Sequence, residues 1–122
     1  MAEHNDLGKF GEQEVVDHLV AEGYDVVERN WRMNHLEIDI IATRGDEIAF
    51  VEVKTRTDDR RDPLEAMTPR KVALLSRAAE AYIRMNRIAL TPRFDVVAVI
   101  GDAHHRRIEY HKNAFLPPLR TY

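Results

Sequence analysis

The chain has 122 residues, of which 44% are hydrophobic and 32% charged, and it contains no cysteine. This length suits a single domain with one core, and the composition excludes disulfides, thiolate nucleophiles and cysteine zinc sites. No apolar run is long enough to span a membrane and no secretory signal is visible, so we expect a cytoplasmic protein without a membrane partner. We expect one domain over residues 1–122, with its core over about 7–111 and a loosely constrained tail over about 112–122.

The net charge of −3 conceals a strong polarity along the chain. Residues 1–50 contain 4 Lys and Arg residues and 12 Asp and Glu residues, whereas residues 51–122 contain 14 Lys and Arg residues and 9 Asp and Glu residues. An acidic centre beside a basic rim suits a polyanionic ligand, because local potential rather than net charge steers association. Taken alone, however, the charge distribution favours accidental asymmetry on solvated faces.

Periodicity and capping signals predict the order helix, three strands, helix, strand, strand. The first helix covers about residues 7–22, and Asn5 or Asp6 can cap it. The second helix is capped by Thr68, has Pro69 in its first position and runs towards Asn86. The five strands are expected at about 24–28, 36–42, 47–54, 93–101 and 106–111. The segments 30–34 and 56–62 are expected to be connections outside the strands.

The third strand contains the segment IAFVEVKTR, residues 48–56, which begins apolar and then places Glu52 and Lys54 on the face of Ile48 and Phe50. A carboxylate can hold a divalent metal, and a nearby lysine can stabilise phosphate charge or orient water. This pair therefore suits phosphodiester hydrolysis. An ordinary surface pair of Glu and Lys explains the same residues, and for this motif alone it is the better explanation.

The second strand carries Asp39 between two isoleucines in LEIDIIA, residues 36–42. An ionised carboxylate among apolar neighbours is costly unless it is paired or bound to a cation. The hairpin brings Asp39 beside Glu52, so that both could reach one Mg²⁺; an aspartate accepting a nearby main-chain amide is an equally good explanation. Strict alternation predicts two faces, one with Glu37, Asp39 and Ile41 and the other with Leu36, Ile38 and Ile40.

The first helix adds a third acid, Glu12. At about 100° per residue its side chain projects from the apolar side of the helix, together with Val15, Val16, Leu19 and Val20. A long charged side chain can also reach solvent from such a position. The sequence thus predicts an inward-facing Glu12, with solvent exposure of its carboxylate as the alternative.

Taken together, Glu12, Asp39, Glu52 and Lys54 resemble the PD-(D/E)xK nuclease superfamily, whose αβββαβ core has the same element order. More narrowly, the chain resembles the bacterial YraN family, which is nuclease-like and similar to archaeal Holliday junction resolvases. This resemblance covers residues 8–99 and rests on GKFGEQEVVDHLVAEGY, VERNWR, LEIDIIA, IAFVEVKTR and the helix after TPRK. One departure is Leu36, which takes the position of the glycine in the family's Gly-Glu-Ile-Asp motif.

The resemblance implies a restriction-endonuclease-like α/β fold with a central mixed sheet flanked by helices. It also implies that Mg²⁺ or Mn²⁺ is held by Asp39 and Glu52, and by Glu12 directly or through water. Lys54 would stabilise the phosphate transition state or position the attacking water.

Basic residues near these acids suggest a nucleic-acid partner. Arg56, Arg60 and Arg61 follow the third strand, while Arg70 and Lys71 begin the second helix, where free amides and the helix dipole favour phosphates. A solvated loop is the alternative for the arginines, because the acids of the same segment offset them. Those acids are Asp58, Asp59 and Asp62.

Other polar residues have simpler interpretations. Asp95 lies in an apolar strand and is expected to bond the second helix. His35 could join Glu37 and Asp39 around a metal, but its place at the start of a strand favours solvent exposure.

The sequence therefore predicts a metal-dependent DNA endonuclease that hydrolyses phosphodiester bonds, with branched DNA among the candidate substrates. The alternatives are a non-catalytic nucleic-acid-binding module that retains the fold, and a protein-interaction subunit that uses a sheet edge. A homodimer is left open.

Overall fold

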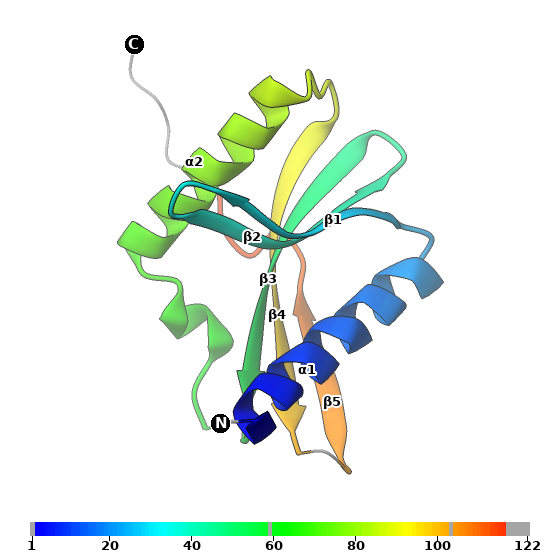
Figure 1. Ribbon diagram of the computed structural model, residues 1–122, viewed down its shortest axis with the longest axis vertical. Helices are drawn as coiled ribbons and strands as arrows, with labels where there is room; N and C mark the ends of the chain where they lie inside the picture. Colours follow the sequence, from blue (N-terminus) through cyan, green and yellow to red (C-terminus); the bar gives the residue numbers. More distant parts are fainter. Residues whose placement is uncertain (1, 59, 103, 117–122) are drawn as a thin grey trace.

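The computed structural model describes residues 2–58, 60–102 and 104–116, with side chains from residue 10 onward. A five-stranded mixed sheet in the order β1-β2-β3-β4-β5 is flanked by two helices (Figure 1). The elements are α1 Ala2–Ala21, β1 Asp25–Met33, β2 Leu36–Arg44, β3 Glu47–Arg56, the 3₁₀ turn η1 Pro63–Ala66, α2 Pro69–Met85, β4 Thr91–Gly101 and β5 Arg106–His111. This is the predicted α/β fold, and it is consistent with a restriction-endonuclease-like core. None of the helices in the described ranges is long and apolar enough to cross a membrane.

The predicted order of helices and strands is confirmed, and so are the ends of the second helix. The Thr68 side chain caps α2 by accepting a hydrogen bond from the Lys71 amide at 3.2 Å, and Asn86 caps its other end. The start of the first helix was placed too late, because α1 already includes Asn5 and Asp6.

The first strand is longer than the sequence predicts, and most of the segment 30–34 belongs to it rather than to a connection. β1 continues to Met33 because its pairing with β2 extends from Thr43 to Leu36, the first residue of β2. Asn30 and Asn34 adopt positive φ angles of 51° and 57°, which asparagine tolerates better than most residues. Asn34 thereby forms the turn between β1 and β2.

The two helices cover opposite faces of the sheet. Val15 and Leu19 of α1 pack with the side of the sheet that includes Val51, whereas α2 packs with the side that includes Phe50. Val20 is not part of the buried stripe, because 57% of it is exposed; the apolar stripe of α1 is narrower than predicted.

Gly11 lets α1 approach the sheet closely. A Cβ atom at this position would lie 3.2 Å from Thr55 Oγ1 and 3.5 Å from the Val99 side chain. A larger residue would push the helix away, so Gly11 sets the depth at which the next residue, Glu12, meets the sheet.

Strand β2 bends at Asp39, which makes the strict alternation predicted for this strand wrong. Leu36 and Ile38 pack on the α2 side, but Ile40 packs on the α1 side. The pairing of β2 with β3 covers only Ile40 to Arg44, and beyond it the Val53 amide donates to the Asp39 carboxylate at 2.8 Å. The β1–β2 hairpin therefore leaves the plane of the sheet and crosses it (Figure 1).

Asp95 does not bond the second helix. Its carboxylate accepts hydrogen bonds from Arg93 on its own strand, from the Tyr110 hydroxyl of β5 and from the Asn113 amide. The start of the expected tail is thus tied to the core, and Phe115 stacks on Phe94 at 5.0 Å. The remainder of that tail, residues 117–122, lies outside the described residues.

Candidate metal-binding and catalytic site

Glu52 is a buried acid with two lysine partners. Only 7% of the residue is exposed, and its Oε1 atom lies 3.5 Å from Lys54 Nζ and 3.7 Å from Lys71 Nζ. Lys54 comes from the same strand, whereas Lys71 comes from the first turn of α2, which covers this face of the sheet. Two ammonium groups therefore converge on one carboxylate.

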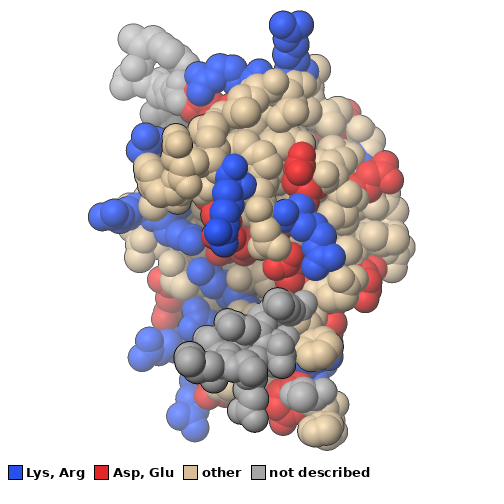
Figure 2. All heavy atoms as spheres, viewed as in Figure 1, with Lys and Arg blue, Asp and Glu red and all other residues tan. Residues whose placement is uncertain are grey.

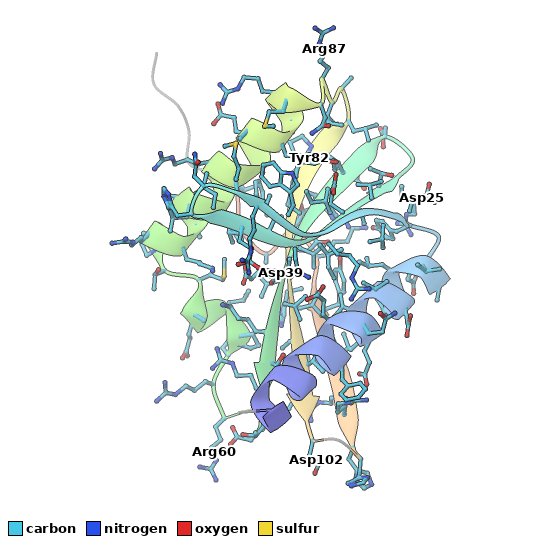
Figure 3. The ribbon with its side chains drawn as sticks, in the orientation of Figure 1. Asp25, Asp39, Arg60, Tyr82, Arg87 and Asp102 are labelled. Atoms are coloured by element: carbon cyan, nitrogen blue, oxygen red, sulfur yellow. The ribbon has the colours of Figure 1, made fainter. Side chains whose placement is uncertain are left out.

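Asp39 lies close to this cluster but in an unfavourable electrostatic position. Burial, and then the charge of Glu52, raise the pKa of Asp39 to about 7, and the charges of Glu37 and Glu12 act in the same direction. The hydrogen bond from the Val53 amide opposes this rise. Figure 3 shows Asp39 near the centre of the molecule, where β2 crosses β3. A cation would favour the ionised form of this carboxyl group.

Glu12 faces inward, as the helical periodicity predicts, and 16% of its side chain is exposed. Its Oε1 atom accepts hydrogen bonds from Asn30 Nδ2 at 3.0 Å and from Arg29 Nε at 3.3 Å. Both donors belong to β1. The charge of Glu12 contributes to the raised pKa of Asp39, but the carboxylate itself is held by β1.

The donor set fits a hard divalent cation held by few protein ligands. Mg²⁺ is commonly bound through one or two carboxylates and completes its shell with water and substrate phosphate. Asp39 and Glu52 supply two such carboxylates, and burial, followed by the charge of Glu52, raises the pKa of Asp39. Within residues 10–58, 60–102 and 104–116 no group of three or more His, Asp or Glu side chains is placed to hold a metal ion. The arrangement suits Asp39 and Glu52 as ligands, whereas the Glu12 carboxylate is bonded by Arg29 and Asn30.

The predicted nucleic-acid-binding residues divide into two groups. Lys71 joins the acidic site through Glu52, and Arg70 is exposed beside it in the first turn of α2. Arg56, Arg60 and Arg61 instead line a separate hollow beyond the end of β3. A metal site formed by His35, Glu37 and Asp39 finds no support. His35 is exposed, and Glu37 pairs with Arg32 at 3.6 Å.

Several residues of the site were not foreseen from the sequence. Arg29 and Asn30 hold Glu12, yet they fall where a connection or strand end was expected, and no local signal marks them as its partners. Lys71 was predicted to contact phosphate, but its ion pair with Glu52 depends on how α2 lies on the sheet. Only the amphipathic pattern of α2 hints that its first turn covers the face of Glu52.

Comparison with known proteins places the chain in a family. The model of the family described as "Uncharacterised protein family UPF0102" matches residues 11–99. A UPF0102 protein of Bacteroides fragilis is 48% identical over 120 residues, which covers 98% of this chain and 99% of that protein. A UPF0102 protein of Flavobacterium psychrophilum is 43% identical over 116 residues, covering 94% of this chain and 98% of that protein. The chain therefore belongs to the UPF0102 family, the YraN-like family that its motifs resemble.

Proposed function

We propose that this protein is a metal-dependent endonuclease that hydrolyses phosphodiester bonds in DNA, with Mg²⁺ or Mn²⁺ held by Asp39 and Glu52. The observation that carries the proposal is the contrast between these neighbouring acids. Burial and like charge raise the pKa of Asp39 to about 7, whereas Glu52 lies beside two lysines. Perturbed carboxylates next to cationic groups are typical of catalytic sites.

Each residue has a distinct role in this mechanism. When bound, a divalent cation supplies Lewis-acid activation of the phosphate and of a water molecule. Asp39 is held in place by the Val53 amide, so its carboxylate is oriented before substrate arrives. Lys54 can donate to a phosphoryl oxygen and stabilise the negative charge that develops there. Glu12 orients water from the α1 side.

Lys71 supports the same chemistry from α2. Its ion pair with Glu52 neutralises a buried carboxylate in the metal-free protein. When Glu52 serves as a metal ligand, Lys71 is available to contact the substrate phosphate from the first turn of the helix.

The proposal is tested with purified protein on plain duplex, flapped, branched and single-stranded DNA, each with Mg²⁺ and with Mn²⁺. We expect the parent to cleave at least one of these DNA forms. Glu52→Gln should lose both cleavage and the Mn²⁺ site measured by calorimetric titration, because it removes a ligand charge. Glu22→Gln is the matched control, since Glu22 is exposed at the end of α1. Cleavage by Glu52→Gln at the parental rate would overturn the proposal.

A second candidate is a nucleic-acid-binding module without catalysis. It is favoured by one observation: the ammonium groups of Lys54 and Lys71 already neutralise Glu52 without any metal ion. If the parent binds all the DNA forms but cleaves none with either metal, this second function replaces the first.

A further inference from the structure

A basic hollow lies at the end of the sheet, away from the acidic site. β3 and β4 are parallel and end side by side, with Arg56 paired to Ile100. The loop after β3 and the turn between β4 and β5 extend from these ends and line two adjoining open cavities of about 340 and 480 Å³, which share Thr57 and Asp58. Figure 3 shows Arg60 of the loop and Asp102 of the turn at this end of the molecule. We call the two cavities together the strand-end hollow.

The lining of the strand-end hollow is strongly basic. Its charged residues are Arg56, Arg60, Arg61, Arg106 and Arg107 against Asp58. Part of this charge is compensated, because Arg60 pairs with Asp58, Arg106 with Glu14 and Arg107 with Glu109. Arg56 and Arg61 form no ion pair with any residue that the structure describes. Figure 2 shows Lys and Arg side chains gathered at the lower left of this face.

The Arg56 side chain has a buried hydrogen-bond donor that lacks an acceptor among the described residues. This donor is its Nε atom. A buried donor without an acceptor is costly, and the guanidinium fork matches the oxygens of a phosphate. Because that Nε atom is hidden from solvent, a phosphate would be bound through the other nitrogens of the Arg56 guanidinium, which lines the hollow.

The same side chain connects the hollow to the acidic site. Glu52, Lys54 and Arg56 alternate along β3 and so lie on one face of the strand. Four residues of strand span about 13 Å, at roughly 3.3 Å per residue. The roughly 3.4 Å per nucleotide of duplex DNA is only the rise along the helix axis, and consecutive phosphates of one strand lie farther apart than this, so the spacing corresponds to fewer than about four nucleotides.

We propose that the strand-end hollow binds a backbone phosphate of the same DNA strand whose phosphodiester lies at Asp39 and Glu52, fewer than about four nucleotides away. This inference rests on the proposed function for the position of the cut, but the binding of phosphate in the hollow does not require catalysis. DNA would thus follow β3 from the acidic centre to the basic end of the molecule. A DNA strand must therefore be long enough to reach from the acidic site to the strand-end hollow before it binds tightly.

The test compares the parent with the double variant Arg60→Ala and Arg61→Ala, whose side chains are exposed, so that folding is preserved. Arg84→Ala is the control, because it removes an exposed arginine near the other end of α2. Binding of oligothymidylates from about 2 to about 10 nucleotides is measured by anisotropy competition with Ca²⁺ in place of Mg²⁺, at several salt concentrations.

We expect the affinity of the parent to rise by about tenfold or more once the oligonucleotide is long enough to reach both sites, at about three to four nucleotides, since two phosphate sites are then joined by one chain. The double variant should lack this rise, and its salt slope for long oligonucleotides should fall by about one phosphate contact. Short oligonucleotides should bind both proteins equally. The inference is overturned if the double variant keeps the rise, or if it loses the same affinity at every length.

Cleavage separates this inference from the proposed function. If the affinity of the parent rises with oligonucleotide length but the parent cleaves no DNA, phosphate binding in the strand-end hollow is supported and the nuclease function is rejected. If the parent cleaves DNA and the double variant binds and cleaves every length of DNA as well as the parent does, the nuclease function is supported and phosphate binding in the strand-end hollow is rejected.

Discussion

Two aspartates on either side of β3 illustrate opposite uses of a buried carboxylate. Asp95 of β4 is 0% exposed and is bonded by Arg93, Tyr110 and the Asn113 amide. Within the part of the chain that the structure describes, Asp39 of β2 receives one hydrogen bond, from the Val53 amide, and it faces the like charge of Glu52. The first carboxylate is satisfied within the fold, whereas the second is not.

The difference shows how structural and functional acids can be distinguished in one sheet. Asp95 sits in a complete network, and its negative charge together with burial raises the pKa of Tyr110 far above its usual range. Asp39 carries an unfavourable charge that a cation or a proton relieves. The two residues should therefore respond in opposite ways when the carboxylate is removed.

The largest expected effect is on folding. Asp95→Ala leaves the Arg93 guanidinium buried without its main partner, so we expect a loss of about 3–5 kcal/mol in the free energy of unfolding. Urea denaturation measures it, with the exposed Asp46→Ala as control. If Asp95→Ala does not fold, the milder Asp95→Asn should still show a lower midpoint. A loss below about 1 kcal/mol in Asp95→Ala would mean that the network is not structural.

The next effect is on catalysis. Lys54→Ala should lower kcat by about 10²-fold, because it removes a charge that acts on the transition state. Binding of Mn²⁺ and DNA should largely persist, since Asp39 and Glu52 remain. Single-turnover cleavage measures the rate, and the exposed Lys112→Ala is the control. Parental rates in Lys54→Ala would make Lys54 an ordinary strand-end lysine.

A smaller effect concerns pH and stability. Because the pKa of Asp39 is about 7 in the folded protein and ordinarily 3.8, the folded state binds more protons than the unfolded state between these values. The stability of the metal-free parent should therefore fall as pH rises from about 4 to about 7, by at most about 1.4 kcal/mol per pH unit.

Asp39→Asn should remove this contribution, so the variant should be more stable than the parent near pH 7 and should lose the Mn²⁺ site. Urea denaturation across the pH range checks the slope, and Glu22→Gln should keep the parental slope. A large loss of stability in Asp39→Asn would instead mean that the Asp39 carboxylate stabilises the fold, as that of Asp95 does.

The smallest effect is on nucleic-acid affinity. Lys71→Ala should lower DNA affinity and reduce the salt slope by about one phosphate contact. Anisotropy titrations at several salt concentrations measure both quantities. Parental affinity at low salt would mean that Lys71 serves only its ion pair with Glu52.

The sequence alone determined much of the fold and the identity of the candidate acids. Helical and strand periodicity, the Thr68 cap and the turn residues are local signals, and they suffice for the order of the elements and for the limits of α2. The placement of Glu52 beside Lys54 on the face of Phe50 also follows from local alternation. These features depend on neighbours a few residues away in the chain.

Only the tertiary structure decided how the acids are held. The bend of β2 at Asp39, the β1 partners of Glu12 and the approach of Lys71 to Glu52 all join segments that are distant in sequence. Asp95 was assigned to the wrong partner for the same reason, since β5 rather than α2 supplies the Tyr110 hydroxyl. Side-chain alternation fixes a face but not which neighbouring element covers it, because that choice depends on packing and register across the whole sheet.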